Sequence, residues 1–213
     1  MESCCNTTYQ GTFDDKRAKK ELKEYEASGI KENSQALYQL LQLLDLRDKS
    51  MLEIGGGIGS LIFESFTLGL KTAQYVDISE AYFHTFKSAL KARNLEDKVA
   101  IHLGDFVVLE EKVQKADLVV LDKVICCYED YEALVQNSTA KAASWYAITI
   151  PKDSWWIKIL FSYFIFLKRL KKDFFRPYIH KHRLIFDQIH KAGFQLKEER
   201  KNFMWKSFLF ERI

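Results

Sequence analysis

The sequence has only two prolines and four cysteines in 213 residues, and it has no long apolar run. No uninterrupted apolar stretch reaches the ~18–20 residues of a membrane-spanning helix, which argues against an integral membrane protein. The first residues do not pair a basic segment with an apolar one, so a secretory signal is not expected. We therefore expect a cytoplasmic protein whose thiols stay reduced.

A strong charge of either sign is also missing. Lys and Arg number 32, Asp and Glu number 29, and the formal net charge is +3. The two signs are mixed along most of the chain instead of gathering in a basic stripe, so nucleic-acid binding is not expected. Hydrophobic residues make up 47% of the chain, which is typical of a folded domain.

The cysteines form two vicinal pairs, Cys4-Cys5 and Cys126-Cys127. Neither pair has the two-residue gap of a zinc knuckle or a redox motif. If the N-terminal segment folded over the second pair, four thiolates could hold zinc or a thiophilic acceptor such as arsenite. The simpler interpretation is that these cysteines act as small buried hydrophobes, and we expect no metal site.

Short apolar runs alternate with helix-like segments through the middle of the chain. The pattern predicts strands at about 50–54, 72–76, 99–103, 117–121 and 144–150. Helices are predicted between them, at about 60–68, 79–93 and 130–139. Strands separated by helices form a parallel sheet with helices on both faces, so the fold class is α/β with a Rossmann-like sheet.

Both ends of the chain add elements to this sheet. Two helices are predicted before the first strand, and Asn33-Ser34 offers an N-cap for the second of them. Near the C-terminus, a helix at about 181–192 precedes two strands, whose tight connection implies an antiparallel hairpin. We assign residues 1–48 to an N-terminal helical cap over a cofactor site and residues 49–213 to the main domain.

A glycine-rich turn follows the first strand, with Gly55, Gly57 and Gly59 at alternate positions. Glycine lets the backbone approach a ligand closely, although many nucleotide-binding folds share this feature. The spacing differs from the G-x-G-x-x-G of dinucleotide enzymes. Glu53 lies two residues before the loop, where an acid would attract an ammonium group and repel a diphosphate. This favours S-adenosylmethionine (SAM), which carries an amino group and no diphosphate, over NAD.

Two further acids follow at strand ends. Asp77 lies 18 residues after Gly59, close to the ~20-residue spacing of an acid that binds ribose hydroxyls. Asp105 could accept a hydrogen bond from an adenine amino group, while Phe106 packs on the ring. An aspartate at a strand end can also be a simple turn former.

These residues carry a family resemblance. Met51–Gly59, Val76–Ser79, Gly104–Phe106 and Asp117–Asp122 resemble the first four motifs of class I SAM-dependent methyltransferases. The resemblance implies a seven-stranded sheet whose last strand is antiparallel. It also implies a SAM pocket lined by Glu53, Gly55, Gly57, Asp77, Ile78, Asp105, Phe106 and Asp122. We add Gly59 to the loop residues, and Arg17 of the N-terminal helix as a partner for the SAM carboxylate, although a solvated helix face would explain Arg17 equally well.

The segment after the fourth strand bears on the methyl acceptor. It lacks the proline turn of amino-methylating DNA enzymes, and Tyr128-Glu129-Asp130 is a poor match to the double-glutamate loop of arginine methyltransferases. Leu121–Tyr128, Pro177–His180 and Ala192–Phe194 resemble the magnesium-protoporphyrin O-methyltransferase branch and its small relatives. The acceptor is therefore expected to be a small molecule, planar or apolar, methylated on oxygen or nitrogen.

The candidate acid–base groups are His180 and Tyr128, with Lys123 and Asp122 as further options. Histidine titrates in the useful range and is the commonest general base. A purely structural role is the alternative for His180 and for Tyr128, and a carboxylate acceptor would need no base. The alternative for the whole protein is a SAM-binding sensor or scaffold without catalysis; a NAD-dependent oxidoreductase is less favoured.

The segment at about 154–172 is the most unusual stretch of the chain. It is apolar and aromatic nearly all round a helical wheel, and then becomes basic at Lys168, Arg169, Lys171 and Lys172. Three interpretations stay open: a core helix, a lid over an apolar substrate, and a peripheral membrane contact through residues 155–172. The oligomeric state is also left open.

Overall fold

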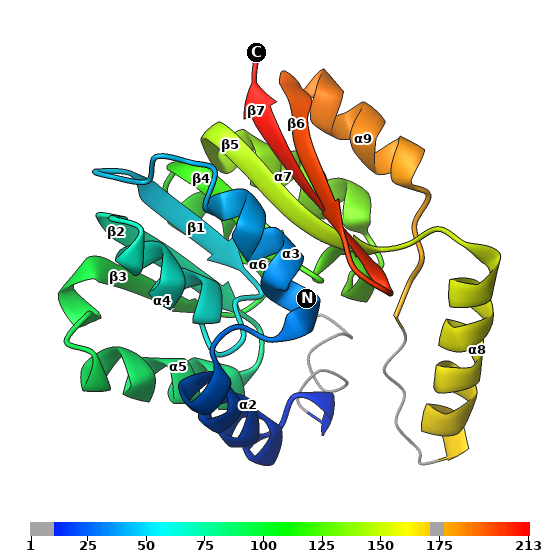
Figure 1. The fold of residues 1–213 in the computed structure, drawn as a ribbon, viewed down its shortest axis with the longest axis horizontal. Coiled ribbons are helices and arrows are strands. Elements are labelled where there is room, and N and C mark those ends of the chain that lie inside the picture. The colour runs from blue at the N-terminus through cyan, green and yellow to red at the C-terminus, as the bar shows by residue number, and fades with distance from the viewer. Residues whose placement is uncertain (1–10, 171–176) are drawn as a thin grey trace.

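The computed structural model describes residues 11–170 and 177–213. Its centre is a seven-stranded sheet in the order β3-β2-β1-β4-β5-β7-β6 (Figure 1). The strands β3, β2, β1, β4 and β5 pair in parallel, whereas β7 is antiparallel to both β5 and β6. This confirms the predicted fold class. The strand bounds are Ser50–Ile54 for β1, Thr72–Asp77 for β2, Val99–Leu103 for β3, Ala116–Asp122 for β4, Ala142–Pro151 for β5, Phe194–Lys201 for β6 and Trp205–Arg212 for β7.

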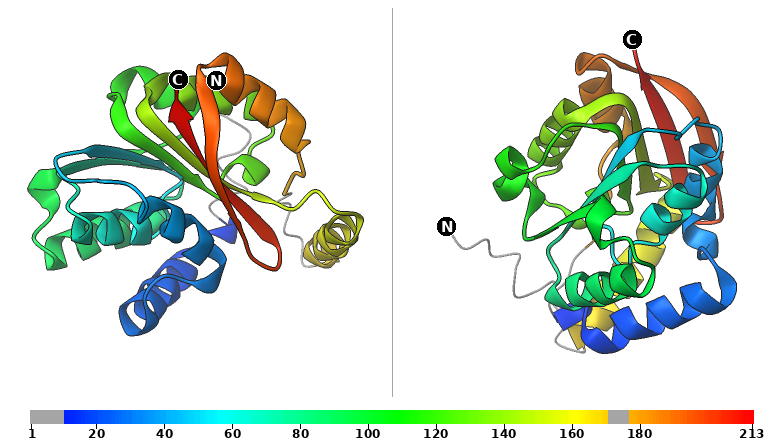
Figure 2. Two further views of the ribbon diagram at one scale, coloured as in Figure 1. Left: turned by 45° about the horizontal axis from the view of Figure 1, so that its top comes forward. Right: turned by 90° about the vertical axis from the view of Figure 1, so that its left-hand side faces the viewer.

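Helices connect and cover these strands (Figures 1 and 2). The α-helices are α2 (Asp15–Ser28), α3 (Glu32–Leu41), α4 (Ser60–Thr67), α5 (Glu80–Ala92), α6 (Phe106–Leu109), α7 (Tyr131–Lys141), α8 (Trp155–Leu170) and α9 (His182–Lys191). Short 3₁₀ turns lie at η1 (Glu96–Lys98), η2 (Glu110–Lys112) and η3 (Ile125–Cys127). Within the two described ranges, no helix is long and apolar enough to cross a bilayer.

The core consists of two main layers, one on each face of the sheet. Successive strand residues point to opposite faces, so Met51 of β1 packs against α3, α4 and α5, while Leu52 packs against the layer of α6, α7 and α9. The central strands are buried on both faces, which explains why their sequences are continuous apolar runs. This two-sided packing holds the carboxyl ends of β1 and β4 side by side.

One sequence expectation about α3 is wrong. The helix begins at Glu32, and its N-cap is Lys31, which makes no side-chain cap hydrogen bond. Ser34 therefore does not cap the helix. Its hydroxyl instead turns toward the end of β4 and donates to Asp122 Oδ2 at 2.6 Å. A carboxylate acceptor gives a stronger hydrogen bond than a neutral backbone partner, which accounts for the different orientation.

The turn from β1 into α4 depends on glycine for packing. Gly59 has φ +75°, a left-handed conformation that side chains disfavour. A Cβ atom there would lie 2.1 Å from Phe86 Cε2, inside the aromatic core between α5 and the sheet. The last glycine of the loop thus allows α4 and α5 to pack closely.

Gly59→Ala is expected to reduce the free energy of unfolding by about 2–5 kcal/mol, from the left-handed backbone and from overpacking at Phe86 together. Urea denaturation measures the change. Gly11→Ala is the matched control, because a Cβ atom at Gly11 would meet nothing within 4 Å. An equal effect of the two substitutions would contradict the packing role.

Candidate functional site

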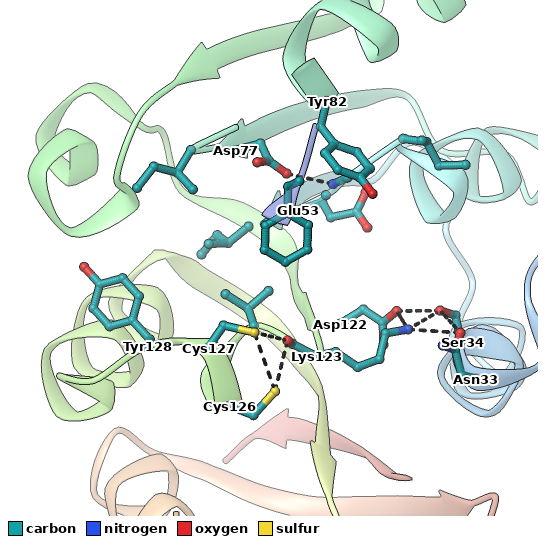
Figure 3. Close-up of a pocket in the computed structure, with 18 of the residues that line it drawn as sticks. Asn33, Ser34, Glu53, Asp77, Tyr82, Asp122, Lys123, Cys126, Cys127 and Tyr128 are labelled. Atoms are coloured by element: carbon teal, nitrogen blue, oxygen red, sulfur yellow. Dashed lines mark hydrogen bonds and ion pairs between the residues drawn. The ribbon is translucent and has the colours of Figure 1, made fainter. Parts of the chain in front are cut away.

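A cavity of about 730 Å³ lies at the carboxyl ends of β1, β2 and β4 (Figure 3). Ligands of open α/β sheets collect at this edge, where the strand order reverses between β1 and β4. Both the sheet and the N-terminal helices α2 and α3 contribute residues to the wall of the cavity. The lining includes Arg17, Ser34, Glu53, Gly55, Gly57, Asp77, Ile78, Tyr82, Asp105, Phe106, Asp122, Lys123, Tyr128, Phe161, Met204 and Trp205.

The glycine loop forms one wall of the cavity with bare backbone. Gly55 and Gly57 have φ of +65° and +56°. A Cβ atom on Gly55 would lie 2.6 Å from Val124 Cγ2, and one on Gly56 would lie 2.7 Å from the Tyr75 ring. Side chains are thus excluded here, and a ligand can approach the backbone closely.

Asp77 ties this loop to the end of β2. Its Oδ2 accepts a hydrogen bond from the Gly57 N–H at 2.9 Å, and its Oδ1 accepts one from the Ser79 N–H at 2.8 Å. Burial raises the pKa of the Asp77 carboxyl, while these backbone donors oppose the rise. A carboxylate has about four acceptor positions, so Asp77 keeps capacity for ligand hydroxyls in the cavity.

Glu53 is more deeply buried than Asp77, Asp105 and Asp122, the other acids of the site. Its side chain is buried, and Oε2 has no hydrogen-bond partner among the described residues. Burial raises the pKa of the Glu53 carboxyl well above its usual range, and the nearby charges of Asp122 and Asp77 raise it further. An unpaired buried carboxylate is costly, so a cation beside Glu53 would be strongly favoured.

Asp122 ends β4 on the other side of the cavity and belongs to a polar network. Its Oδ2 accepts from the Ser34 hydroxyl and from Lys123 Nζ, and Lys123 Nζ also donates to Ser34 Oγ (Figure 3). Its Oδ1 is buried without a hydrogen-bond partner in the described chain. Lys123 has φ +63°, which is strained for a lysine and brings its ammonium back onto Asp122.

Tyr128 and His180 are arranged in series. The Tyr128 hydroxyl donates to both carboxylate oxygens of Asp105, at 2.6 and 2.8 Å. His180 Nε2 lies 3.0 Å from the carbonyl oxygen of Tyr128, and its ring packs 4.2 Å from that of Tyr131. Burial lowers the pKa of His180, so the neutral imidazole donates its Nε2–H to that carbonyl. His180 therefore holds Tyr128, and Tyr128 holds Asp105.

Arg17 reaches the cavity from α2. Its Nε donates to Glu21 Oε1 at 3.2 Å, and its guanidinium lies 4.8 Å from the centre of the Phe13 ring. These contacts orient the side chain at the wall of the cavity. Arg17 is thus placed where it can meet an anionic group of a ligand.

The pair Cys126-Cys127 also lies on the cavity wall. The two Sγ atoms are 3.8 Å apart, and each thiol donates to the carbonyl oxygen of Lys123. Cys4 and Cys5, which the four-thiolate arrangement requires, lie outside the described residues. Across residues 11–170 and 177–213, no group of three or more potential metal ligands is found.

The structure brings most of the predicted site residues to one cavity. Gly59 and His180 are not among the residues that line it. From the sequence, Ser34 is expected to cap a helix, so its place in the cavity wall is not predicted. Tyr82 is not predicted there either, because it lies in the first turn of α5 at a position typical of a core residue.

The raised pKa of Glu53 predicts a pH effect on stability. The folded state binds the Glu53 proton more tightly than the unfolded state, so this contribution is fully present below the ordinary pKa of glutamate and is lost as pH rises from there to the raised pKa. Relative to Glu53→Gln, the unfolding free energy of the wild type should fall by up to about 1.4 kcal/mol per pH unit across that window.

Thermal and urea unfolding at several pH values measures this difference. Asp77 is present in both proteins, so of its effects only its coupling to the Glu53 charge differs between them. Glu111→Gln, at an exposed position, is the control and should follow the wild-type profile. Parallel profiles for wild type and Glu53→Gln would show that Glu53 is not buried in this way.

Comparisons with known proteins identify the architecture. No protein-family model matches the chain, and no curated protein matches its sequence. Among solved structures, magnesium protoporphyrin IX methyltransferase from Synechocystis PCC 6803 with bound SAH has a TM-score of 0.74 at 17% identity, over 97% of this chain and 99% of that one. The same enzyme with bound SAM has a TM-score of 0.69 at 15% identity, over 98% of this chain and 97% of that one.

Two longer proteins match over part of their length. An O-methyltransferase family protein from Burkholderia thailandensis has a TM-score of 0.70 at 16% identity, over 96% of this chain and 62% of that one. The pyocyanin biosynthetic protein PhzM has a TM-score of 0.67 at 16% identity, over 97% of this chain and 61% of that one. The chain has the fold of the class I SAM-dependent methyltransferases.

Proposed function

We propose that the protein is a SAM-dependent methyltransferase that acts on a small planar or apolar acceptor. The observation that carries this proposal is the buried carboxyl of Glu53 beside the glycine loop, with its Oε2 unpartnered among the described residues. SAM has two positive groups, an ammonium and a sulfonium, and one carboxylate. Its net charge is therefore positive, which complements the Glu53 carboxylate. NAD brings a diphosphate, which Glu53 would repel.

The other residues fit the remaining parts of SAM. Asp77 has spare acceptor positions for the ribose hydroxyls, and Asp105 has them for the adenine amino group beside the ring of Phe106. Arg17 provides a cation for the SAM carboxylate. The solved relatives that were crystallised with SAH and SAM support the same use of the fold.

SAM would supply the electrophilic methyl group, and the protein would hold the acceptor atom in line with it. Asp122 and Lys123 at the carboxyl end of β4, with Ser34 of α3, lie on the side of the cavity away from Tyr128 (Figure 3). We assign the acceptor's proton, where it has one to lose, to Oδ1 of Asp122, the carboxylate oxygen that Ser34 and Lys123 leave without a partner among the described residues. Tyr128 and His180 then act as positioning residues for Asp105, since their hydrogen bonds lead there.

The acceptor side of the cavity is apolar. Its wall includes Leu160 and Phe161 of α8, together with Met204 and Trp205 at the start of β7. Such a wall suits a flat or apolar acceptor. The methyl group would be transferred to an oxygen or nitrogen atom of that acceptor. Two matching structures bear names that refer to a porphyrin and to pyocyanin, which supports a planar acceptor of that general shape.

Binding measurements test the cofactor assignment. The wild type is expected to bind SAM and SAH in isothermal calorimetry and to give no heat with NAD. Glu53→Gln should weaken SAM binding by about ten- to a hundredfold, because a charged hydrogen bond is worth ~1.5–3 kcal/mol. Glu111→Gln should bind as the wild type does. Binding of NAD without SAM would refute the proposal.

The series from His180 to Asp105 makes a separate prediction for Tyr128. Tyr128→Phe should raise the Kd of SAH about tenfold or more, because Asp105 loses a charged hydrogen bond. A phenol that acted on the acceptor would instead lower kcat and leave the Kd of SAH unchanged. Calorimetry with SAH, combined with kinetics once an acceptor is found, distinguishes the two outcomes.

Turnover separates an enzyme from a SAM-binding sensor. SAM labelled in its methyl group is incubated with the protein and a panel of porphyrins, phenazines and hydroxyaromatic compounds, and the label is followed into product. Transfer that Lys123→Met abolishes and Lys20→Met preserves would support the proposed network, since Lys20 lies on the exposed side of α2. Tight SAM binding with no transfer to any member would favour the sensor.

A further inference from the structure

Helix α8 presents an apolar outer face. Trp155, Ile159 and Tyr163 are spaced four residues apart, so they lie along one side of the helix. Their exposed fractions are 74%, 60% and 59%. Soluble proteins rarely expose large apolar side chains in a contiguous group unless that group binds something.

The turn between β6 and β7 extends this face. Phe203 is 74% exposed, and its ring centre lies 5.1 Å from that of Trp156 in α8. In Figure 1, α8 stands at the margin of the molecule, away from the sheet, with its outer side uncovered by other described elements. We call Trp155, Trp156, Ile159, Tyr163 and Phe203 the outer patch.

The opposite side of α8 already supplies its packing. Ile157 and Phe161 are buried, and the Phe161 ring lies 6.5 Å from that of Trp205. Leu160 and Phe161 also line the cavity. Ile157 and Phe161 thus anchor the helix to the rest of the molecule, and the exposed side chains of Trp155 and Ile159 do not contribute to the core.

Charge points to the occupant of this patch. The sequence becomes basic at the end of α8: Lys168 and Arg169 belong to its last turn, and Lys171 and Lys172 follow it in the sequence. Exposed aromatic and aliphatic side chains beside a basic run are typical of helices that lie at the surface of anionic membranes. A second copy of the chain would carry the same positive charges, which offers no charge complementarity for the contact.

We propose that the outer patch binds the surface of membranes that contain anionic lipids, with α8 lying in the interface. With 16 residues α8 is about 24 Å long, which suits a helix that lies along a membrane better than one that crosses it. Leu160 and Tyr163 line the cavity and are also exposed, so docking would place one edge of the cavity at the lipid surface. An apolar acceptor could then enter from the membrane, a consequence that rests on the proposed function.

Flotation with lipid vesicles tests this proposal on the full chain. The wild type should float with vesicles of phosphatidylcholine and phosphatidylserine, and much less with phosphatidylcholine alone or at high salt. Trp155→Ser combined with Ile159→Ser should weaken vesicle binding about tenfold or more, since two large apolar groups no longer insert. Val108→Ser is the matched control, because Val108 is 73% exposed on α6 and is not in the patch.

Size-exclusion chromatography and SAH calorimetry complete the test. The double variant should bind SAH as the wild type does, so a loss of vesicle binding is separable from misfolding and from a failure of the proposed function. The proposal is overturned if the wild type ignores anionic vesicles, or if the double variant floats equally well. A wild-type dimer that the double variant converts to a monomer, without vesicle binding, would assign the patch to a second copy.

Discussion

The buried carboxyl of Glu53 is the constraint around which the site is built. It lies near the end of β1, the strand between β2 and β4, and its side chain is buried. Asp77 and Asp122 stand nearby, so three acids share a small volume and raise the pKa of Glu53 together with its burial. A protein that retains such a group loses stability at neutral pH unless a cation binds there. We infer that the loss of folding stability caused by Glu53 is offset when a positively charged ligand binds beside it.

The surrounding structure keeps this arrangement in place. The glycine loop passes so close to Val124, Tyr75 and Phe86 that a side chain at Gly55, Gly56 or Gly59 would collide. Asp77 fixes the loop through the Gly57 N–H. Across the cavity, Ser34 of α3 and the strained Lys123 hold one oxygen of Asp122 and leave the other without a partner among the described residues. Helix α3 is thus linked to the end of β4 through the Ser34 hydroxyl, and Asn33 adds a longer contact to Lys123.

Much of this could be predicted from the sequence, and the limits have physical causes. The strands were predictable because those of a parallel sheet are continuous apolar runs, and the acids at their ends follow from the loop spacing. The inward turn of Ser34 could not be predicted, because it depends on Asp122, which is 88 residues away in the chain. The same holds for Tyr128 and His180, whose place in a series toward Asp105 depends on tertiary contacts. The sequence also does not show which side of α8 is buried, because the helix is apolar nearly all round. Tertiary contacts decide this.

Proton release on cofactor binding tests the central claim most directly. Calorimetry of SAM binding near neutral pH, in buffers of different ionisation enthalpy, counts the protons exchanged. If Glu53 is held neutral by burial and becomes charged opposite the SAM ammonium, the wild type should release up to one proton and Glu53→Gln almost none. Binding of SAM with equal proton exchange in both proteins, or no binding of SAM at all, would contradict the account.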